Sequence, residues 1–416
     1  MGNYIINGGR KLSGSITLES AKNAVLPMIA GSILTDEEVV IKNCPKISDV
    51  LSMVKIITHL GAKTEFNGED LIINCKEIFR CDIPYEMSKE LRASFLLLGA
   101  LLARNKKVKI AHPGGCEIGI RPIDIHISAL KTLGVQILEQ DGELICTCEK
   151  IDGKDVYFDF PSVGATENVM LASSLSNGVT KIHNPAKEPE IIDLAEMLNK
   201  MGAKIYGAGT NVIVIEGVNK LHGITYKPIP DRIEAGTYLI AGAITGGEIE
   251  IRNVKPENIS SLIVKLCDNT CKIRLKNDII YLKSGEVRKS FSISTGPYPF
   301  FPTDMQAQVT SLLAVSQGIS VVEENVFEMR FRHVPELVKM GADIKVRGRT
   351  AIIKGVKKLC GGSVTAYDLR CAAALVIAGL SADGKTVIDG IKHLERGYFD
   401  MPNKLRLLGA DVCKRE

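Results

Sequence analysis

One phrase of three residues recurs along this chain and limits what it can fold into. The phrase reads Leu60-Gly61-Ala62, and it returns as Leu133-Gly134-Val135, Met201-Gly202-Ala203, Met340-Gly341-Ala342 and Leu408-Gly409-Ala410. Each copy ends an amphipathic stretch, such as residues 47–60, and leads into a short alternating segment. A glycine at that point is the expected left-handed stop of a helix. The phrase therefore predicts repeated units, each with a helix followed by a strand.

The spacing of these glycines sets the size of the unit. They lie 73, 68, 139 and 68 positions apart. The long interval predicts a sixth, degenerate copy at residues 262–275, where Thr270 and Cys271 stand in place of Gly-Ala. The period is then about 70 residues, longer than the roughly 20–50 residues of the usual solenoid repeats. We therefore interpret each repeat as a small α/β module.

Each repeat also contains a helix that is apolar on nearly every face. These stretches are residues 24–34, 93–103, 169–175, 236–244, 307–315 and 371–380. A helix without a polar face must be buried on all sides. Six such helices and six sets of strands predict two groups of three, with the buried helices inside and the sheets outside.

The boundary between the two groups is expected inside Lys227-Pro-Ile-Pro230. Residues 21–229 would form one domain from repeats one to three and would carry the loop around Cys116. Residues 230–416 would form the second domain from repeats four to six. We expect residues 1–20 to complete the second domain, because a closed arrangement of six units leaves one chain end to pair with the other.

Composition narrows the class of protein. At roughly 100–200 residues per domain, 416 residues predict two or three domains. Apolar residues make up 45% of the chain, aromatic residues only 5%, and there is no tryptophan, so the core must be aliphatic. A net charge of +4 does not indicate a nucleic-acid partner but fits small anionic substrates.

The eleven cysteines form no metal-binding or disulfide framework. Cys146 and Cys148, and Cys267 and Cys271, are close pairs, but neither has a second pair or a histidine at zinc spacing, so we expect no metal site. Free thiols in this number indicate a reducing compartment. The N-terminus does not read as a signal peptide, and apolar runs of about 10 residues are half the length of a membrane span. The sequence therefore predicts a soluble cytoplasmic protein.

Cations occur where the predicted buried helices begin. Lys22, Arg92, Arg232 and Arg370 each stand at such a start. A cation near the positive end of a helix dipole is unfavourable by up to about 1 kcal/mol. Structure alone gains little from this arrangement, whereas an anion bound at a free helix N-terminus would explain it. If both domains direct these ends inward, the cleft between them would trap anions.

The stretch from Pro113 to His126 combines glycines, prolines, one cysteine and one arginine. Glycine in that density costs ordering entropy, which suits a loop that opens and closes over a ligand better than a core element. Arg121 supplies a fixed, charged fork for phosphate or carboxylate. Cys116, flanked by small residues, would be accessible to substrate.

These residues belong to phrases that resemble a known family. The phrases are Glu19-Ser-Ala-Lys-Asn-Ala24, Arg92-Ala-Ser94, Gly114-Gly-Cys-Glu-Ile-Gly-Ile-Arg-Pro122, Ser162-Val-Gly-Ala-Thr166, Glu188-Pro-Glu190, Pro230-Asp-Arg-Ile-Glu234, Phe301-Pro-Thr-Asp-Met-Gln-Ala307, His333-Val-Pro-Glu336 and Glu395-Arg-Gly397. Over essentially the whole chain they resemble the UDP-N-acetylglucosamine 1-carboxyvinyltransferase family of enolpyruvyl transferases. The resemblance implies an α/β fold, a two-domain inside-out α/β barrel in which each domain has three repeated units with buried helices and outer four-stranded sheets.

The resemblance also assigns substrates and residues. Phosphoenolpyruvate would be clamped by Lys22, Arg121 and Arg396, with Asn23 near the reacting carbon and Arg330 and Arg370 adding positive charge. UDP-N-acetylglucosamine would lie along Arg92, Arg121, Pro122, Ile123, Asp124, Ile125, Ser162, Val163, Gly164, Asp304 and Val326. Cys116 would donate a proton, can carry a phosphoenolpyruvate adduct, and would be alkylated by the epoxide fosfomycin. Asp304 would be the base. No metal or redox cofactor is implied.

Some positions, Thr270 and Cys271 among them, depart from the family pattern, and alternatives stay open. Phe160 stands where some relatives carry a basic residue, and Tyr298–Phe301 is bulkier than the expected turn. One alternative is the shikimate-pathway enolpyruvyl transferase, which shares the fold but not the Gly-Gly-Cys loop. Another is a catalytically silent paralogue that binds the sugar nucleotide and regulates. RNA-end-processing proteins with related repeats are disfavoured, because the chain has no basic stripe with aromatic residues for stacking.

Overall fold

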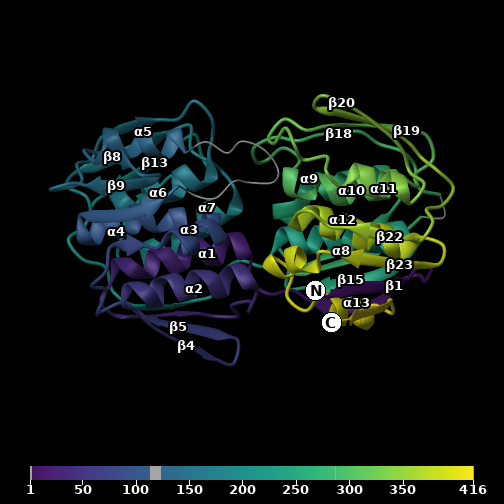
Figure 1. Cartoon of the computed structure of the whole chain (residues 1–416), viewed down its shortest axis with the longest axis horizontal. Helices are drawn as coiled ribbons and strands as arrows, with labels where there is room; N and C mark the ends of the chain where they lie inside the picture. Colours follow the sequence, from purple (N-terminus) through teal and green to yellow (C-terminus); the bar gives the residue numbers. More distant parts are fainter. Residues whose placement is uncertain (1, 113–122, 286, 416) are drawn as a thin grey trace. The chain divides into compact units, whose positions relative to one another are not determined.

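The structure is a computed structural model that describes residues 2–112, 123–285 and 287–415 (Figure 1). The chain divides into two compact units. The N-terminal unit holds residues 20–112 and 123–229, and the C-terminal unit holds residues 2–19, 230–285 and 287–415. Each unit has its own hydrophobic core. The sequence predicts domain boundaries between residues 20 and 21 and between residues 229 and 230. These boundaries stay a prediction.

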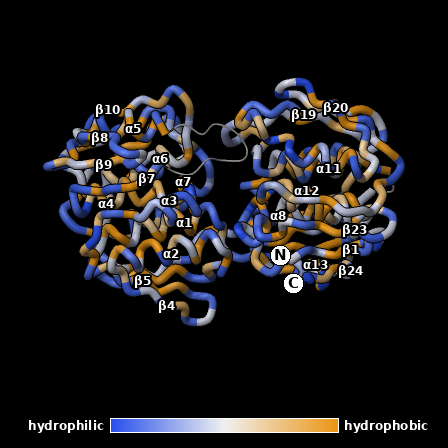
Figure 2. The backbone as a smooth tube through the Cα atoms, viewed as in Figure 1, coloured by the Kyte–Doolittle hydropathy of each residue, from blue (hydrophilic) through white to orange (hydrophobic). Residues whose placement is uncertain are grey.

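In the N-terminal unit, three helices are buried along nearly their whole length: α1 (Lys22–Gly31), α4 (Leu97–Asn105) and α6 (Val163–Ser173). More amphipathic helices pack around them: α2 (Ser48–Leu60), α3 (Tyr85–Glu90), α5 (Asp124–Thr132) and α7 (Pro189–Lys200). Short 3-10 turns extend two of the buried helices: η1 (Ser32–Leu34) and η2 (Arg92–Leu96). The apolar residues along α1 and α4 are visible in Figure 2.

Three four-stranded sheets cover these helices in the described part of the N-terminal unit. One has the order β14-β3-β5-β4, with β3 (Glu38–Ile41), β4 (Lys63–Asn67), β5 (Asp70–Asn74) and β14 (Ile224–Tyr226). The second has the order β6-β7-β9-β8, with β6 (Asp82–Ile83), β7 (Lys107–Ala111), β8 (Gln136–Gln140) and β9 (Glu143–Thr147). The third has the order β10-β11-β13-β12, with β10 (Asp155–Tyr157), β11 (Val179–His183), β12 (Lys204–Tyr206) and β13 (Val212–Glu216).

The C-terminal unit repeats this plan. Its buried helices are α8 (Arg232–Thr245), α10 (Gln306–Leu313) and α12 (Leu369–Ser381). The helices outside them are α9 (Ser260–Asp268), α11 (Val334–Lys339) and α13 (Met401–Leu407). Three 3-10 turns accompany them: η3 (Pro256–Ile259), η4 (Thr303–Met305) and η5 (Ile391–Arg396).

The sheets of the C-terminal unit also have four strands each among the described residues. One has the order β16-β17-β15-β2, with β2 (Ser13–Thr17), β15 (Glu248–Arg252), β16 (Lys272–Lys276) and β17 (Ile279–Lys283). The second has the order β18-β19-β21-β20, with β18 (Ile293–Ser294), β19 (Ile319–Glu323), β20 (Asp343–Arg347) and β21 (Thr350–Lys354). The third has the order β22-β23-β1-β24, with β1 (Asn3–Asn7), β22 (Ser363–Thr365), β23 (Lys385–Asp389) and β24 (Asp411–Arg415).

Chain segments remote in sequence complete these sheets. At one edge of every sheet described here, a strand runs parallel to its neighbour, and the remaining pairs are antiparallel. β2 fills that parallel edge beside β15, with Ile16 opposite Ile251. β1 inserts between β23 and β24, and β14 returns to lie beside β3. The six sheets and the buried helices confirm the predicted fold class.

The glycines of the recurring phrase are left-handed, as predicted. Gly61, Gly134, Gly202, Gly341 and Gly409 have φ angles of 114°, 93°, 102°, 93° and 84°. At the degenerate copy, Thr270 adopts a φ of 81° after α9, a conformation that is energetically unfavourable for a β-branched residue. Its hydroxyl donates a hydrogen bond to the carbonyl of Val287, which fixes the turn that glycine makes elsewhere.

Gly61 and Gly134 provide a matched pair for testing the helix stops. A Cβ on Gly61 would lie 2.3 Å from the carbonyl oxygen of Glu77 and 2.7 Å from a ring carbon of Phe79, whereas on Gly134 its nearest neighbour is the Lys150 carbonyl oxygen at 3.8 Å. We expect Gly134→Ala to lower the free energy of unfolding by about 1–2 kcal/mol, the cost of a left-handed alanine. Gly61→Ala should cost about 1–3 kcal/mol more, because backbone must also move. Urea unfolding of both variants measures this, and equal losses would contradict it.

Candidate active site

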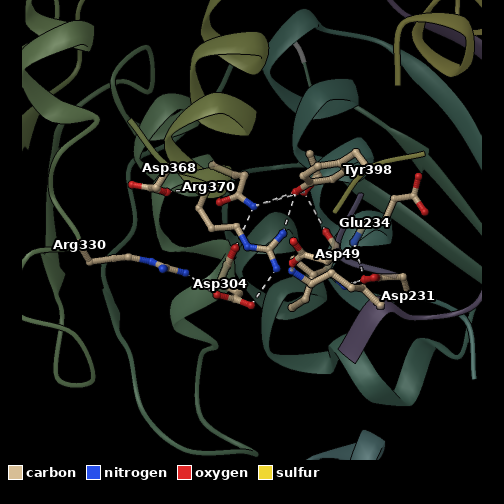
Figure 3. A network of polar contacts seen from close by, with 12 residues as sticks. Asp49, Asp231, Glu234, Asp304, Arg330, Asp368, Arg370 and Tyr398 are labelled. Carbon is tan, nitrogen blue, oxygen red and sulfur yellow. Dashed lines mark hydrogen bonds and ion pairs between the residues drawn. The ribbon is translucent and has the colours of Figure 1, made fainter. Parts of the chain in front are cut away.

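A carboxylate held by two arginines forms the centre of the polar cluster in the C-terminal unit (Figure 3). Arg370 donates from Nη2 to Oδ2 of Asp304 at 2.8 Å. Arg330 approaches the other carboxylate oxygen, Oδ1, and donates to it from its own Nη2. Both arginine side chains are buried, while that of Asp304 is 28% exposed. The structure therefore brings together three of the residues that the sequence analysis assigned to substrate binding.

Local structure explains why these three side chains meet. Asp304 lies in η4, directly before α10, and Arg370 is the second residue of α12. Asp368 caps α12 by accepting from the backbone N–H groups of Arg370 and Cys371 at 2.8 and 3.0 Å. Two carboxylates beside the start of α12 thus offset the unfavourable position of the Arg370 cation. Burial by itself lowers the pKa of Arg370, but Asp304 and its other neighbours raise that pKa above its ordinary value.

A fully buried glutamate supports the loop that follows β19. Glu324 accepts from the hydroxyls of Thr295 and Thr303 at 2.9 and 3.0 Å. It also accepts from the backbone N–H groups of Val326 and Phe327 at 2.9 and 3.0 Å. One carboxylate thereby fixes Val326, an expected sugar-nucleotide contact, and Thr303, the neighbour of Asp304.

Two other expected cations of the C-terminal unit are placed as follows. Arg232 begins α8 beside the capping residue Asp231, and its guanidinium lies 5.7 Å from the ring centre of Tyr298. Arg396 is the last residue of η5 and is partly buried. Arg232 thus lies at a helix start, as the sequence analysis predicted, whereas Arg396 lies at the end of a 3-10 turn.

In the N-terminal unit, the ion pair of Lys22 and Asp49 stands out. Lys22 is the first residue of α1, and its Nζ lies 3.1 Å from Oδ2 of Asp49 in the first turn of α2. The two side chains are only 14% and 7% exposed. Asn23 and Arg92 are partly exposed at the starts of α1 and η2. A cation at a helix start is thus again opposed by a carboxylate.

The expected sugar-nucleotide residues near α5 and α6 lie at helix starts. Ser162 caps α6 by accepting from the backbone N–H of Ala165 at 3.4 Å. Gly164 packs closely against His126, because a Cβ there would lie 3.1 Å from the imidazole ring. His126 is held by the side-chain amide of Asn168, 2.9 Å from its Nδ1. Val163 is the first residue of α6, while Ile123, Asp124 and Ile125 lie at the start of α5.

Three expected site residues, Cys116, Arg121 and Pro122, lie outside the described residues. The sequence analysis missed several others that the structure brings into the polar clusters, namely Asp49, Glu324 and Tyr398. Asp49 reads as an ordinary acidic residue in a first helical turn, and Glu324 follows a strand without any motif. Of these three residues, Tyr398 is the one that the sequence could have indicated, because it directly follows the phrase Glu395-Arg-Gly397.

In the described part of the chain, no group of three or more histidine, cysteine, aspartate or glutamate side chains is arranged to hold a metal ion. None of the described helices has the length and apolar character needed to cross a bilayer.

Comparison with known proteins places the chain in a family. A family model described as EPSP synthase (3-phosphoshikimate 1-carboxyvinyltransferase) matches residues 6–405. UDP-N-acetylglucosamine 1-carboxyvinyltransferase 2 of Caldanaerobacter subterraneus subsp. tengcongensis is 48% identical to this chain over 415 residues, 100% of both chains. The enzyme of that name from Geobacter metallireducens is 45% identical over 412 residues, 99% of each chain. The chain belongs to the UDP-N-acetylglucosamine 1-carboxyvinyltransferase family. The resemblance drawn from the motifs is therefore confirmed.

Solved structures show how widely the fold of this family is shared. The enolpyruvyl transferase NikO from Streptomyces tendae matches with a TM-score of 0.90 at 24% identity, covering 99% of this chain and 98% of that one. EPSP synthase from Acinetobacter baumannii matches with a TM-score of 0.77 at 19% identity, covering 100% of both chains. At such identities the likeness concerns the fold alone.

We expect His333, directly before α11, to make the free energy of unfolding depend on pH. Burial, aided by the Arg330 cation and opposed by Asp368, lowers its pKa from 6.5 to about 4. The unfolded chain then binds a proton between pH 6.5 and 4 that the folded chain does not, so stability falls as the pH drops through that range. Relative to His333→Gln, the wild type should lose about 2 kcal/mol between pH 7.5 and 5. Urea unfolding at both pH values measures the change.

The control for this experiment is an exposed histidine. His222→Gln replaces a ring at the surface of the N-terminal unit, and we expect its stability to follow that of the wild type at both pH values. An equal pH dependence of the wild type and His333→Gln would show that His333 is not held neutral by burial.

Proposed function

We propose that this chain transfers the enolpyruvyl group of phosphoenolpyruvate to the 3-hydroxyl of UDP-N-acetylglucosamine and releases phosphate, the first committed step of peptidoglycan synthesis. The observation that carries this proposal is the 48% identity, over the full length of both chains, to a relative named for that reaction. The pairing of Asp304 with Arg330 and Arg370 supports it, because these groups suit a base beside anionic substrates.

The proposed reaction proceeds by addition and elimination. The oxygen of the sugar 3-hydroxyl bonds to C2 of phosphoenolpyruvate, the hydroxyl proton passes to a base, and another proton is added to C3. In the second stage C3 loses a proton, the bond between C2 and the phosphate oxygen breaks, and inorganic phosphate leaves. The tetrahedral intermediate carries phosphate and carboxylate on one carbon, so its charge must be stabilised by cations.

Asp304 is the proposed base for the sugar hydroxyl. Each of its oxygens accepts from one arginine, and a carboxylate offers about four lone-pair positions in all. Its partial exposure makes it more accessible than either arginine. Gln308 holds its backbone by donating to the carbonyl oxygen at 2.8 Å. A base must lie within hydrogen-bond reach of the proton that it removes, and this clamp restricts its position.

The proposed anion-binding residues are those that the sequence motifs assign. Lys22, Arg121 and Arg396 would bind phosphoenolpyruvate with Asn23, while Arg330 and Arg370 would add positive charge. Arg92, the segments 121–125 and 162–164, Asp304 and Val326 would bind the sugar nucleotide. The buried ion pair of Lys22 with Asp49 supports this assignment, because it holds the ammonium group in place before substrate arrives.

Cys116 is the proposed acid that protonates C3. The same thiol would bond to the epoxide carbon of fosfomycin, opening the ring. The cysteines described in the structure are all free thiols, which fits a cytoplasmic location. Seven of the ten described cysteines lie buried or partly buried. Burial raises the pKa of Cys44 and of Cys75 to about 12, so neither is a ready nucleophile.

The choice of acceptor can be tested directly, because the matching family model is described as EPSP synthase. Purified protein should release phosphate from phosphoenolpyruvate when UDP-N-acetylglucosamine is present and not when shikimate 3-phosphate is present. Without an acceptor the release should stay at background. Turnover of shikimate 3-phosphate alone would reverse the assignment, and binding of the sugar nucleotide without turnover would favour the regulatory paralogue.

Substitution of Cys116 tests its role as an acid. Cys116→Ala should abolish phosphate release or reduce it by about 10²–10⁴-fold, the usual contribution of general acid–base catalysis. Cys116→Asp should remain active, because a carboxyl group can donate the proton, and it should resist fosfomycin. The exposed Cys267 provides the control, since Cys267→Ala should keep both activity and sensitivity. Unchanged rates in Cys116→Ala would remove the assigned role.

A further inference from the structure

We infer that the hydroxyl of Tyr398 is a positioning group for the reaction, acting through Arg370 and Asp304. The inference rests on the proposed function, because it concerns how the proposed base and an anion-binding arginine are held. Tyr398 lies two residues after the end of η5, and its ring is buried in the C-terminal unit. Figure 3 shows its hydroxyl directed toward Arg370, which lies between Tyr398 and Asp304.

Arg370 is fixed at both ends of its guanidinium group. Nη2 donates to Asp304 at 2.8 Å, and Nη1 donates to the Tyr398 hydroxyl oxygen at 3.3 Å. The planar guanidinium can point at the carboxylate from many rotations about its bonds, and the second contact selects one of them. Tyr398 therefore restricts the direction in which Arg370 presents its remaining N–H groups.

The hydrogen-bond partners of Tyr398 determine where its own proton points. Thr237 on α8 donates its hydroxyl proton to the carbonyl of Ile233 at 2.8 Å. A hydroxyl has one proton, so Thr237 must accept at its 2.7 Å contact with Tyr398. Tyr398 then donates to Thr237 and turns its lone pairs toward the Arg370 cation. Burial raises the pKa of Tyr398 although Arg370 lowers it, so the hydroxyl keeps its proton.

Gln308 connects the same hydroxyl to the backbone of the proposed base. Its Nε2 donates to the carbonyl oxygen of Asp304 at 2.8 Å. The same Nε2 lies 3.3 Å from the hydroxyl oxygen of Thr237 and 3.4 Å from that of Tyr398, so the second amide proton faces both hydroxyls. Tyr398 thus contacts one group that holds the Asp304 carboxylate and another that holds its backbone. Side chains of three buried helices, α8, α10 and α12, converge on this one oxygen.

A catalytic group that moves by about 1 Å can lose about 10²-fold in rate. Loss of the Tyr398 hydroxyl would free Arg370 to rotate and would leave the Gln308 amide without one acceptor. Both changes act on the position of Asp304 and Arg370 rather than on the reacting atoms. The hydroxyl should therefore affect kcat more than the KM for either substrate.

Tyr398→Phe removes this hydroxyl and keeps the ring, whose centre lies 5.8 Å from the Arg370 guanidinium carbon. We expect kcat to fall about tenfold, the loss that corresponds to one hydrogen bond to a charged group. Both KM values should change less than about threefold, because the hydroxyl acts on the position of Asp304 and Arg370 rather than on the substrates. Phosphate release is measured well below the thermal midpoint of each variant, so that unfolding does not contribute.

Tyr238→Phe is the matched control. Tyr238 is also fully buried on α8, next to Thr237, but its hydroxyl has no hydrogen-bond partner among the residues that the structure describes. We expect its kcat to equal that of the wild type. A tenfold loss in both variants would indicate a general packing effect and would overturn the inference.

A second substitution tests whether Tyr398 acts through Arg370. Arg370→Lys cannot reach Asp304 and Tyr398 at once with a planar fork, so it should itself lower kcat. In that background Tyr398→Phe should reduce kcat less than about twofold further, because groups that act together are not additive. A full tenfold loss in both backgrounds would overturn the inference. If Tyr398→Phe does not fold, Thr237→Val, which removes the acceptor of its proton, is measured in the same cycle.

The wild type separates failure of this inference from failure of the proposed function. If the wild type turns over UDP-N-acetylglucosamine and Tyr398→Phe has wild-type kcat, only the positioning role is wrong. If the wild type turns over shikimate 3-phosphate instead, the proposed acceptor is wrong, and the same variants measured with that acceptor still decide the role of Tyr398. Turnover of neither acceptor would overturn both.

Discussion

Burial of helices without a polar face is the constraint on which the rest of this structure depends. α1, α4 and α6 in one unit, and α8, α10 and α12 in the other, have no side that can face water. Each group of three must be covered by sheets, because strands can bury one face and expose the other. The aliphatic composition follows from the same need, since closely packed helices leave little room for aromatic rings.

Because the sides of these helices are covered, polar groups can reach a ligand or solvent mainly from the helix ends. The starts of the buried helices carry cations that helix stability alone disfavours, and the structure opposes them with carboxylates. Asp304 and Asp368 lie beside the start of α12, and Asp49 pairs with Lys22 at the start of α1. A carboxylate beside a buried cation compensates its charge and keeps it in place. Binding of anionic substrates by such cations is therefore compatible with a stable core.

The sheets show how a repeated fold closes on itself. β1 and β2 join sheets formed mainly by residues after 240, and β14 returns to the first sheet of the N-terminal unit. These pairings depend on backbone hydrogen bonds and on the alternation of side chains, not on particular residues. This explains why NikO from Streptomyces tendae retains the fold with a TM-score of 0.90 at 24% identity.

The sequence by itself determined the repeat, because one phrase returns along the whole chain. It also determined the helix stops and the buried helices, because these depend on the pattern of residues within a few turns of chain. Gly61 and its counterparts, and even Thr270 in the degenerate copy, are left-handed at the predicted places. Only the tertiary structure decided which carboxylate opposes each cation. Asp304 and Arg370 are 66 positions apart, and Thr237 and Tyr398 are 161 apart. No local pattern encodes such contacts, because they form only when helices from different repeats pack side by side.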